Sequence, residues 1–342
     1  MDNPENPSMD QVSAHLDRAW ELVGRGDFRA ALQSAEKGLE LDAGSADAHY
    51  LVGYIHAQEG SAEEALEHYE QALELDDTFF EAMLNAAEVL VHSLGDSGEA
   101  LRLLDDALDY AETPEEIADA LLLRIDAHLL AGDTESARRS LALVPDGPFE
   151  NPHIEFLIAR ARFEVGNLEG VEAMLRRVIA AEPHHSDAYY YLGLALDRAE
   201  DLRGATVAFL HVRELDAHAP RPPWAVTTEL FEKRIEHVVG QVSAPFRSAL
   251  DGTLVVVVES PGAEVVADGV DPRATLLLDA LGPADEPPKV GRLFIYQRNV
   301  ERAVPSVHAM DEEILLSIER ELRAAFPTAY PAAVVDGGAE SN

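Results

Sequence analysis

Residues Ser45–Asp77, SADAHYLVGYIHAQEGSAEEALEHYEQALELDD, decide the fold that we expect for this chain. Two helix-forming runs lie on either side of a short turn. Gly53 and the alanines of the second run are small residues at points where two helices folded back on each other would touch, and Tyr69 fills the space beside them. Ser61 and Glu64 have the form of a capping box that opens the second helix. The stretch therefore predicts a pair of antiparallel helices.

The same turn recurs along the first 219 residues, at Gly26, Gly60, Gly95, Gly132, Gly166 and, without its glycine, Glu200. The steps between these turns are 34, 35, 37, 34 and 34 residues. A small residue follows each turn, at Ala31, Ala65, Ala100, Ala137, Val171 and Ala205. A helix–turn–helix period of about 34 residues resembles that of the tetratricopeptide repeat family. We therefore predict six such repeats over residues 12–219, stacked into a right-handed superhelix.

In the tetratricopeptide repeat family, the first helix of each pair lines the concave wall of the superhelix. By position, the resemblance places ten residues on this wall: Trp20, Asp47, Tyr50, Tyr54, Asn85, Glu88, Asp126, Arg160, Asp187 and Tyr190. Aromatic and amide side chains suit the capture of a peptide. Because Arg160 is the one base of this set, the wall does not favour a clamp for terminal carboxylates, and we expect a neutral or basic protein segment as the ligand. The alternative is that these side chains are merely solvated or lie between repeats.

The composition excludes several classes of function. The 342 residues carry a formal net charge of −38, and no Lys or Arg lies between Lys37 and Arg102. Such a field repels a phosphate backbone, so we expect no nucleic-acid partner, although acidity alone also serves solubility. No apolar run is long enough to cross a membrane, and the first residues lack the features of a secretion signal. Cysteine is absent. A cytoplasmic location is the simplest expectation.

A second, smaller domain is expected after the repeats. Three prolines within residues 218–224, HAPRPPW, interrupt the helical pattern and predict a linker at 220–225. Residues 226–330 then contain a helical run around 230–239, strands at 254–258 and 291–296, and an amphipathic helix at 312–326. We predict a mainly α protein, in which the helical repeats are followed by a small α+β domain. Residues 1–11 and 331–342 are expected to be tails, the second of them disordered.

The sequence of the second domain resembles those of the minimal zincin-like metallopeptidases. The resemblance covers residues 226–327 and rests on FEKRIEHVV, LVVVVESP with DGVDPRATLLL, and LFIYQRNVER, followed by the closing helix. In that family the closing helix carries HExxH, whose two histidines hold Zn²⁺. Here Arg320 and Ala324 stand at the two histidine positions, and Glu321 keeps the place of the general base. Because neither Arg nor Ala can ligate zinc, we expect no metal, no cofactor and no catalytic residue.

The sequence therefore predicts a cytoplasmic, non-enzymatic interaction protein with a degenerate zincin-like domain. One alternative is a metallopeptidase with a rearranged metal site that would use His237 or His308. Another is a purely structural assembly module.

Overall fold

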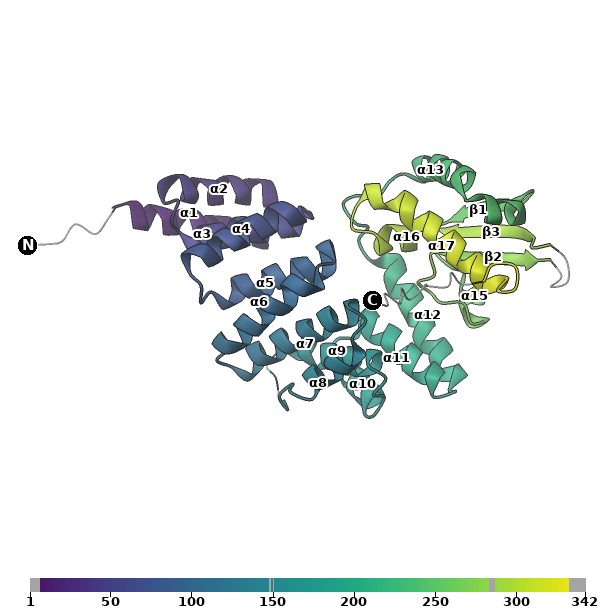
Figure 1. Cartoon of the computed structure of the whole chain (residues 1–342), viewed down its shortest axis with the longest axis horizontal. Helices are drawn as coiled ribbons and strands as arrows, with labels where there is room; N and C mark the ends of the chain where they lie inside the picture. The colour runs from purple at the N-terminus through teal and green to yellow at the C-terminus, as the bar shows by residue number, and fades with distance from the viewer. Residues whose placement is uncertain (1–6, 148, 150, 283–286, 332–342) are drawn as a thin grey trace, which may run out of the picture. The chain divides into compact units, whose positions relative to one another are not determined.

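The computed structural model describes residues 7–147, 149, 151–282 and 287–331, and it divides into two compact units, residues 1–195 and 196–342. The predicted tails therefore lie almost wholly outside the described residues. Within the first unit, paired antiparallel helices follow one another along the chain (Figure 1). Their bounds are α1 Pro7–Gly24, α2 Phe28–Leu41, α3 Ala46–Glu59, α4 Ala62–Leu75, α5 Phe80–Val89, α6 Ser97–Tyr110, α7 Pro114–Leu130, α8 Thr134–Leu141, α9 Pro152–Glu164, α10 Val171–Ala181 and α11 Ser186–Arg198.

The turns between paired helices have the geometry that the glycine pattern predicts. The glycines at 26, 60, 95, 132 and 166 have φ between 71° and 80°, a left-handed conformation that glycine adopts without steric penalty. Glu200 adopts the same conformation, with φ 61°, at the sixth turn. The repeat geometry therefore persists at this turn although its glycine is missing.

Close helix packing explains the small residues of the repeats. The side chains of Ala31, Ala65, Ala100, Ala137, Val171 and Ala205 are all buried. At Gly53, a Cβ atom would lie 2.8 Å from the Tyr69 ring and 3.0 Å from the backbone oxygen of Ala65. Tyr69 is itself only 1% exposed. The tight contact predicted within the second repeat is therefore confirmed.

One local prediction was wrong. Ser61 is the N-cap of α4, but its side chain makes no capping hydrogen bond. A complete capping box forms at α7 instead, where Thr113 accepts from the N–H of Glu116 and the Glu116 carboxylate accepts from the N–H of Thr113. The sequence motif thus marks the start of α4 without the reciprocal bonds that define the capping box.

The two irregular repeat steps have structural counterparts. The 35-residue step between Gly60 and Gly95 includes a π-helical turn, Leu90–Leu94, that continues α5. Such a turn accommodates one extra residue in a helix. The 37-residue step into the fourth repeat includes α7, which has 17 residues where α3 has 14. The stacking of the repeats is kept in both places.

The second unit contains α12 Leu202–His218, α13 Thr228–Gln241, α14 Ala244–Arg247, β1 Leu254–Val258, α15 Ala263–Ala267, β2 Leu276–Leu281, β3 Val290–Tyr296, α16 Gln297–Ala303 and α17 Met310–Ala325. The strand order in its sheet is β1-β3-β2. β1 is parallel to β3, with Val256 opposite Phe294, and β2 is antiparallel to β3, with Leu278 opposite Leu293. The sequence predicts β1 and β3 but not β2.

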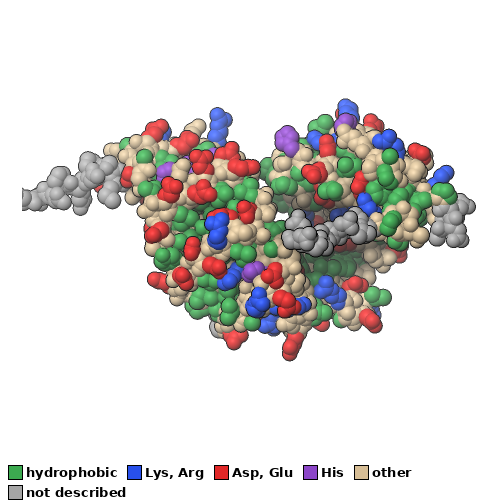
Figure 2. Space-filling view, viewed as in Figure 1, with side chains coloured by type: hydrophobic (Ala, Val, Ile, Leu, Met, Phe, Trp, Pro, Cys, Tyr) green, Lys and Arg blue, Asp and Glu red, His purple; other side chains and the backbone are tan. Residues whose placement is uncertain are grey.

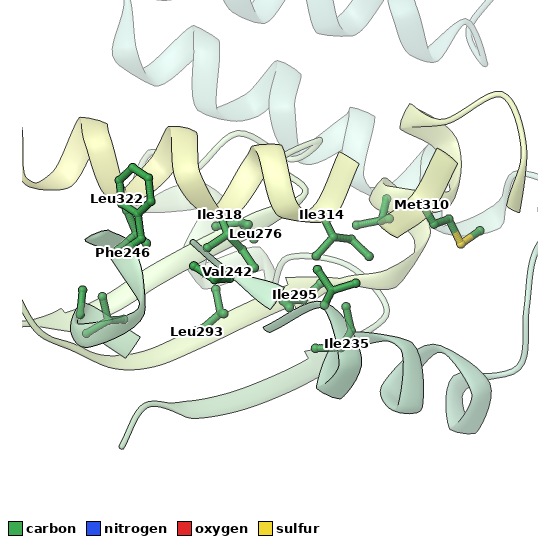
Figure 3. Close-up of a cluster of buried hydrophobic side chains, with 14 of the residues drawn as sticks. Ile235, Val242, Phe246, Leu276, Leu293, Ile295, Met310, Ile314, Ile318 and Leu322 are labelled. Carbon is green, nitrogen blue, oxygen red and sulfur yellow. The ribbon is translucent and has the colours of Figure 1, made fainter. Parts of the chain in front are cut away.

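The core of the second unit lies between one face of this sheet and the helices α13 and α17 (Figure 3). Ile235 of α13 and Ile314, Ile318 and Leu322 of α17 are almost fully buried, together with Leu293 and Ile295 of β3. The spacing of the three α17 residues, four apart, places them on one side of the helix. α17 therefore contacts the sheet through a continuous apolar stripe.

The proline-rich segment is attached to the second unit by polar contacts. Glu301 of α16 is 0% exposed. Its carboxylate accepts hydrogen bonds from the Arg221 guanidinium at 2.6 Å and from the N–H of Val226 at 3.2 Å, and its backbone oxygen accepts one from the Trp224 indole at 3.0 Å. A buried carboxylate needs such partners to remain charged. The segment is thus held against α16.

Helix α12, expected as the last helix of the array, lies in the second compact unit. Its Arg213 donates to the backbone oxygen of Pro261 at 2.7 Å, and its Asp216 accepts from Arg273 at 2.9 Å. The compact units thus divide within α11, earlier than the linker expected at 220–225. The domain limits expected from the sequence remain predictions.

Candidate functional site

Aromatic side chains gather on the first helices of the first two repeats. The ring of Trp20, on α1, lies 6.2 Å from that of Tyr50 and 5.2 Å from that of Tyr54, both on α3. Trp20 is 41% exposed, and the two tyrosines are half-buried. Such tilted contacts hold the rings in fixed orientations. Three of the predicted wall residues therefore form one accessible aromatic group.

Neighbouring side chains fix Tyr50 within this group. Its ring contacts Phe79 at 4.9 Å and Tyr69 at 5.9 Å, and its hydroxyl accepts a hydrogen bond of 3.0 Å from the amide of Asn85 on α5. Burial, followed by the nearby Glu81 carboxylate, raises the pKa of Tyr50 to about 12. Tyr50 is thus a neutral hydroxyl that connects the second repeat to the third.

A pocket of about 360 Å³ lies among the first helices of the third, fourth and fifth repeats. Its polar lining includes three of the predicted residues, Glu88, Asp126 and Arg160. Leucines from the same three helices provide its apolar surface: Leu84, Leu122, Leu123 and Leu157. The pocket therefore combines apolar walls with charged groups of both signs.

The charges in this pocket are partly compensated. Arg160, on α9, forms an ion pair with Asp126 on α7, whose side chain is 12% exposed. Nε2 of His92 lies 3.7 Å from the same carboxylate. Asp119 is half-buried, and burial, followed by repulsion from Glu115, raises its pKa. An acid in that position favours a cationic ligand group, because a nearby positive charge would stabilise its ionised form.

His153 lies on the same side of the pocket as Arg160, on α9. Burial, followed by the neighbouring His185 ring 5.9 Å away, lowers the pKa of His153. His153 is therefore neutral near pH 7 and offers a hydrogen-bonding group rather than a charge.

The remaining predicted residues lie outside these two groups. Asp47 is exposed in the first turn of α3. Asp187 and Tyr190 are half-buried on α11. The structure thus assembles Trp20, Tyr50, Tyr54 and Asn85 at one place and Glu88, Asp126 and Arg160 at another.

The sequence could have revealed two of the pocket residues that the prediction missed. Asp119 and His153 each lie 13 residues before the turn glycine of their repeat, Gly132 or Gly166, and thus have the position that the predicted Asp47 has before Gly60. Each also precedes a predicted wall residue on its own helix, Asp126 or Arg160, by seven residues, which is about two helical turns. Tyr69 and Phe79 lack this signal, because they lie outside the first helices.

Helix α17 carries Arg320, Glu321 and Ala324, which the predicted zincin-like resemblance aligns with HExxH. Arg320 is hydrogen-bonded to the hydroxyl of Ser317 at 3.2 Å and lies 3.4 Å from the Glu321 carboxylate, while Ala324 is exposed. Among the described residues, no group of three His, Cys, Asp or Glu side chains is placed to hold a metal ion. His237 instead contacts Gln241, four residues further along α13.

Acidic side chains are spread over the face of the molecule shown in Figure 2, and basic ones are fewer. Within the described part of the chain, no helix is both long and apolar enough to cross a membrane. The excess of acidic side chains agrees with the formal net charge of −38.

Comparison with curated proteins finds photosystem I assembly proteins Ycf3. That of Acaryochloris marina is 33% identical over 85 residues, which cover 24% of this chain and 51% of that protein. That of Rippkaea orientalis is 33% identical over 117 residues, covering 31% and 67%. The chain thus spans about half the length of the first of these relatives.

Solved structures share the fold of the array. Pseudomonas aeruginosa PilF matches with a TM-score of 0.53 and 17% identity, covering 68% of this chain and 100% of PilF. PilW, a type IV pilus biogenesis factor, matches with a TM-score of 0.52 and 20% identity, covering 61% and 94%. A family model described as "Tetratricopeptide repeat" matches residues 16–78, 93–150 and 156–214. Since these segments make up more than half of the chain and lie over the helices of the array other than α5, the chain belongs to the tetratricopeptide repeat family.

Proposed function

We propose that this protein is a non-catalytic scaffold that binds a neutral or basic protein segment along the first helices of its repeats. The observation that carries the proposal is the pairing of two unlike subsites on these helices. One is the aromatic group around Tyr50, and the other is the pocket around Asp126 and Arg160. An extended segment would place an apolar side chain on the first and a cationic one in the second.

The charge around the pocket supports a basic rather than an acidic ligand. Glu88 and Asp119 lie in the pocket without an ion pair to any described residue, whereas Arg160 is neutralised by Asp126. A terminal carboxylate would need uncompensated bases, and the aromatic group contains none. The Ycf3 relatives are described as assembly proteins, which agrees with a scaffold.

For the second unit, we propose a zincin-like domain without zinc. The guanidinium of Arg320 and the methyl of Ala324 supply no donor for a metal, and Glu321 lies beside Arg320. Glu321 is then an ion-paired carboxylate rather than a general base. A metallopeptidase with a rearranged site would need three ligands, which the described residues do not bring together. We also propose the cytoplasmic location expected from the sequence.

Selection of displayed random peptides on the full-length protein tests the scaffold proposal. We expect the selected peptides to carry more Lys and Arg than Asp and Glu, with an aromatic or aliphatic residue nearby. Trp20→Ala with Tyr54→Ala removes the aromatic subsite, and Asp119→Asn removes the uncompensated acid. Each variant should weaken binding, the second mainly at low salt.

The exposed Asp106, on the second helix of the third repeat, provides the matched control. Asp106→Asn removes one acid from α6, outside the first helices, and should leave the affinity unchanged. Selection of acidic peptides, or equal binding by all variants, would contradict the proposed wall. Failure to select any peptide would favour a purely structural module. Stoichiometric zinc in the purified protein, lost in His237→Ala or His308→Ala, would instead establish the metallopeptidase.

A further inference from the structure

Strand β1 has an open edge. It lies at the end of the β1-β3-β2 sheet and pairs with β3 alone among the described strands (Figure 1). Every second residue of an edge strand directs its N–H and C=O away from the sheet. These groups form a template to which another extended chain can bind.

The sequence of β1 lacks the usual protection of such an edge. Natural edge strands carry Lys, Pro, a bulge or an inward-pointing charge. β1 reads Leu-Val-Val-Val-Val, and its register with β3 is continuous over all five residues. Leu254 is 60% exposed, and Val255–Val258 are only partly buried. An apolar strand without protection is typical of an edge that another chain covers.

An apolar slot accompanies this edge. Val255 and Val257 point to the side of the sheet covered by α13, and with Ile235 and Val239 of that helix they line a pocket of about 380 Å³. An added strand would place every second side chain on the same side of the sheet, beside this slot. The slot therefore selects for apolar residues at alternate positions.

Two acids lie at the rim of the slot. Glu232 and Glu236 are exposed, four residues apart on α13, and line the same pocket. Neither forms an ion pair with a described residue, while the cations of α13 are engaged elsewhere, Lys233 with Glu229 and Arg234 with Asp311. Like charges at this spacing repel each other. A ligand cation would remove that repulsion.

We propose that β1 is a docking strand, to which an extended, basic and apolar segment of a partner protein adds as a fourth strand. The backbone of that segment pairs with the open edge, its apolar side chains enter the slot beside Val255 and Val257, and one Lys or Arg reaches Glu232 and Glu236. The aliphatic stem of a lysine suits this position, since it packs on apolar surface while its ammonium meets the acids. This surface is separate from the wall of the repeats.

The test uses the full-length protein and the labelled peptide Thr-Val-Thr-Lys-Thr-Val-Thr. In an added strand, its two valines and its lysine share one face. We expect binding, measured by fluorescence anisotropy, with shifts of the backbone amide NMR signals of Leu254–Val258. Replacing the peptide lysine by Glu should weaken binding about tenfold, which corresponds to about 1.4 kcal/mol.

Two N-methylated versions of the peptide test strand addition directly. One carries methyl groups on the nitrogens of the valines and the lysine, and the other on those of the second and third threonines. Because alternate N–H groups of a strand point to opposite sides, one version should lose binding at least tenfold and the other should retain it within about threefold. Equal behaviour of the two versions overturns the proposal.

Protein variants locate the site. Glu232→Lys with Glu236→Lys should weaken peptide binding about tenfold, and Leu254→Lys should do the same by placing a charge on the edge. Glu214→Lys is the matched control, since Glu214 is exposed on α12 of the same unit and should have no effect. Trp20→Ala with Tyr54→Ala should also bind normally, which separates this site from the proposed wall.

A second copy of the chain is the competing occupant of this edge. Sedimentation equilibrium of the wild-type protein and of Leu254→Lys distinguishes the two. If the wild-type protein is a dimer that Leu254→Lys dissociates, and the peptide does not bind, β1 pairs with itself and the proposal is wrong. Absence of both peptide binding and dimer formation also overturns it.

Discussion

Replacement of Gly53 by Ala tests whether close helix packing in the second repeat determines the fold of the array. The added methyl would lie 2.8 Å from the Tyr69 ring and 3.0 Å from the Ala65 backbone oxygen. The ring is buried and the backbone belongs to α4, so neither can yield without moving the helix. Overpacking of this kind costs about 1–3 kcal/mol. The higher helix propensity of Ala offsets about 1 kcal/mol. We therefore expect a net destabilisation of up to about 2 kcal/mol.

Native-state hydrogen exchange measures this loss locally, since repeats open in cooperative units. In Gly53→Ala the amides of α3 and α4 should exchange faster, by up to about 30 times, while those of α13 stay unchanged. Gly240→Ala is the control, because it lies within α13 and a Cβ there meets nothing within 4 Å. That variant should slow exchange in α13. If Gly53→Ala also slowed exchange in α3, the substitution would act through helix propensity alone, and close packing at Gly53 would not contribute to stability as we expect.

Three further substitutions test other features of the two units. Glu200→Gly should stabilise the turn before α12 by about 0.5–1 kcal/mol, because Glu200 has a positive φ, which costs free energy in any residue with a Cβ but not in glycine. A lower thermal stability of this variant than of the wild-type protein would contradict the prediction. The pKa of Tyr50 in the folded protein is raised to about 12, so the same tyrosine in the unfolded chain loses its proton first, and stability should fall as pH rises from about 10 to 12. Because burial also raises the pKa values of Tyr69 and Tyr191, Tyr50→Phe should make this part of the urea-unfolding profile less steep without removing its slope. Arg221→Ala should destabilise the second unit more than Glu301→Gln. The first variant leaves the fully buried Glu301 carboxylate without its cation, while the second leaves the Arg221 guanidinium, which is 33% exposed and can be hydrated. Equal losses of stability in urea unfolding would argue against this ion pair.

The helical array could be predicted from the sequence because its signals are local and repeated. Each turn glycine marks a left-handed residue, and each small residue marks a helix contact, so the phase of one repeat tests that of the next. The prediction of a capping box at α4 was wrong because its hydrogen bonds depend on more than the sequence spacing. Ser61 and Glu64 satisfy the motif, but whether the serine hydroxyl meets a backbone N–H depends on a rotamer that the spacing does not specify.

The second unit was harder to predict because its signals are not repeated. β2 consists of Leu276–Leu281, LLLDAL, which contains no β-branched residue and therefore has weak strand character. Pairing with β3, rather than local propensity, makes it a strand. The position of α12 depends on the ion pair of its Asp216 with Arg273 and on the hydrogen bond from its Arg213 to Pro261, and both partners are distant in sequence from α12. Periodicity along the chain cannot indicate such contacts.

For the candidate wall, the sequence predicts which positions of each repeat lie on the first helices, but not which side chains pair between neighbouring repeats. Position in the repeat predicted Tyr50, Asn85 and Arg160 as wall residues, and the position of Asp47 before its turn would also have indicated Asp119 and His153. It could not show that Asp126 neutralises Arg160, since that depends on how neighbouring repeats stack. This pair changes the charge that the pocket presents. The one base expected on the wall is compensated, so the preference for a basic ligand rests on Glu88 and Asp119 instead.

In α17, the residues that pack against the core are different from those at the positions compared with HExxH. Ile314, Ile318 and Leu322 face the sheet and hold α17 in place. Arg320 and Ala324 lie outside this apolar stripe and are exposed. Residues at those two positions can therefore change with little effect on the core, because most of the free energy of helix packing comes from the buried stripe. The packing of α17 therefore does not depend on whether residues that ligate a metal stand at these positions. Under the proposal made above, the surface that this domain offers to a partner is the open edge of β1.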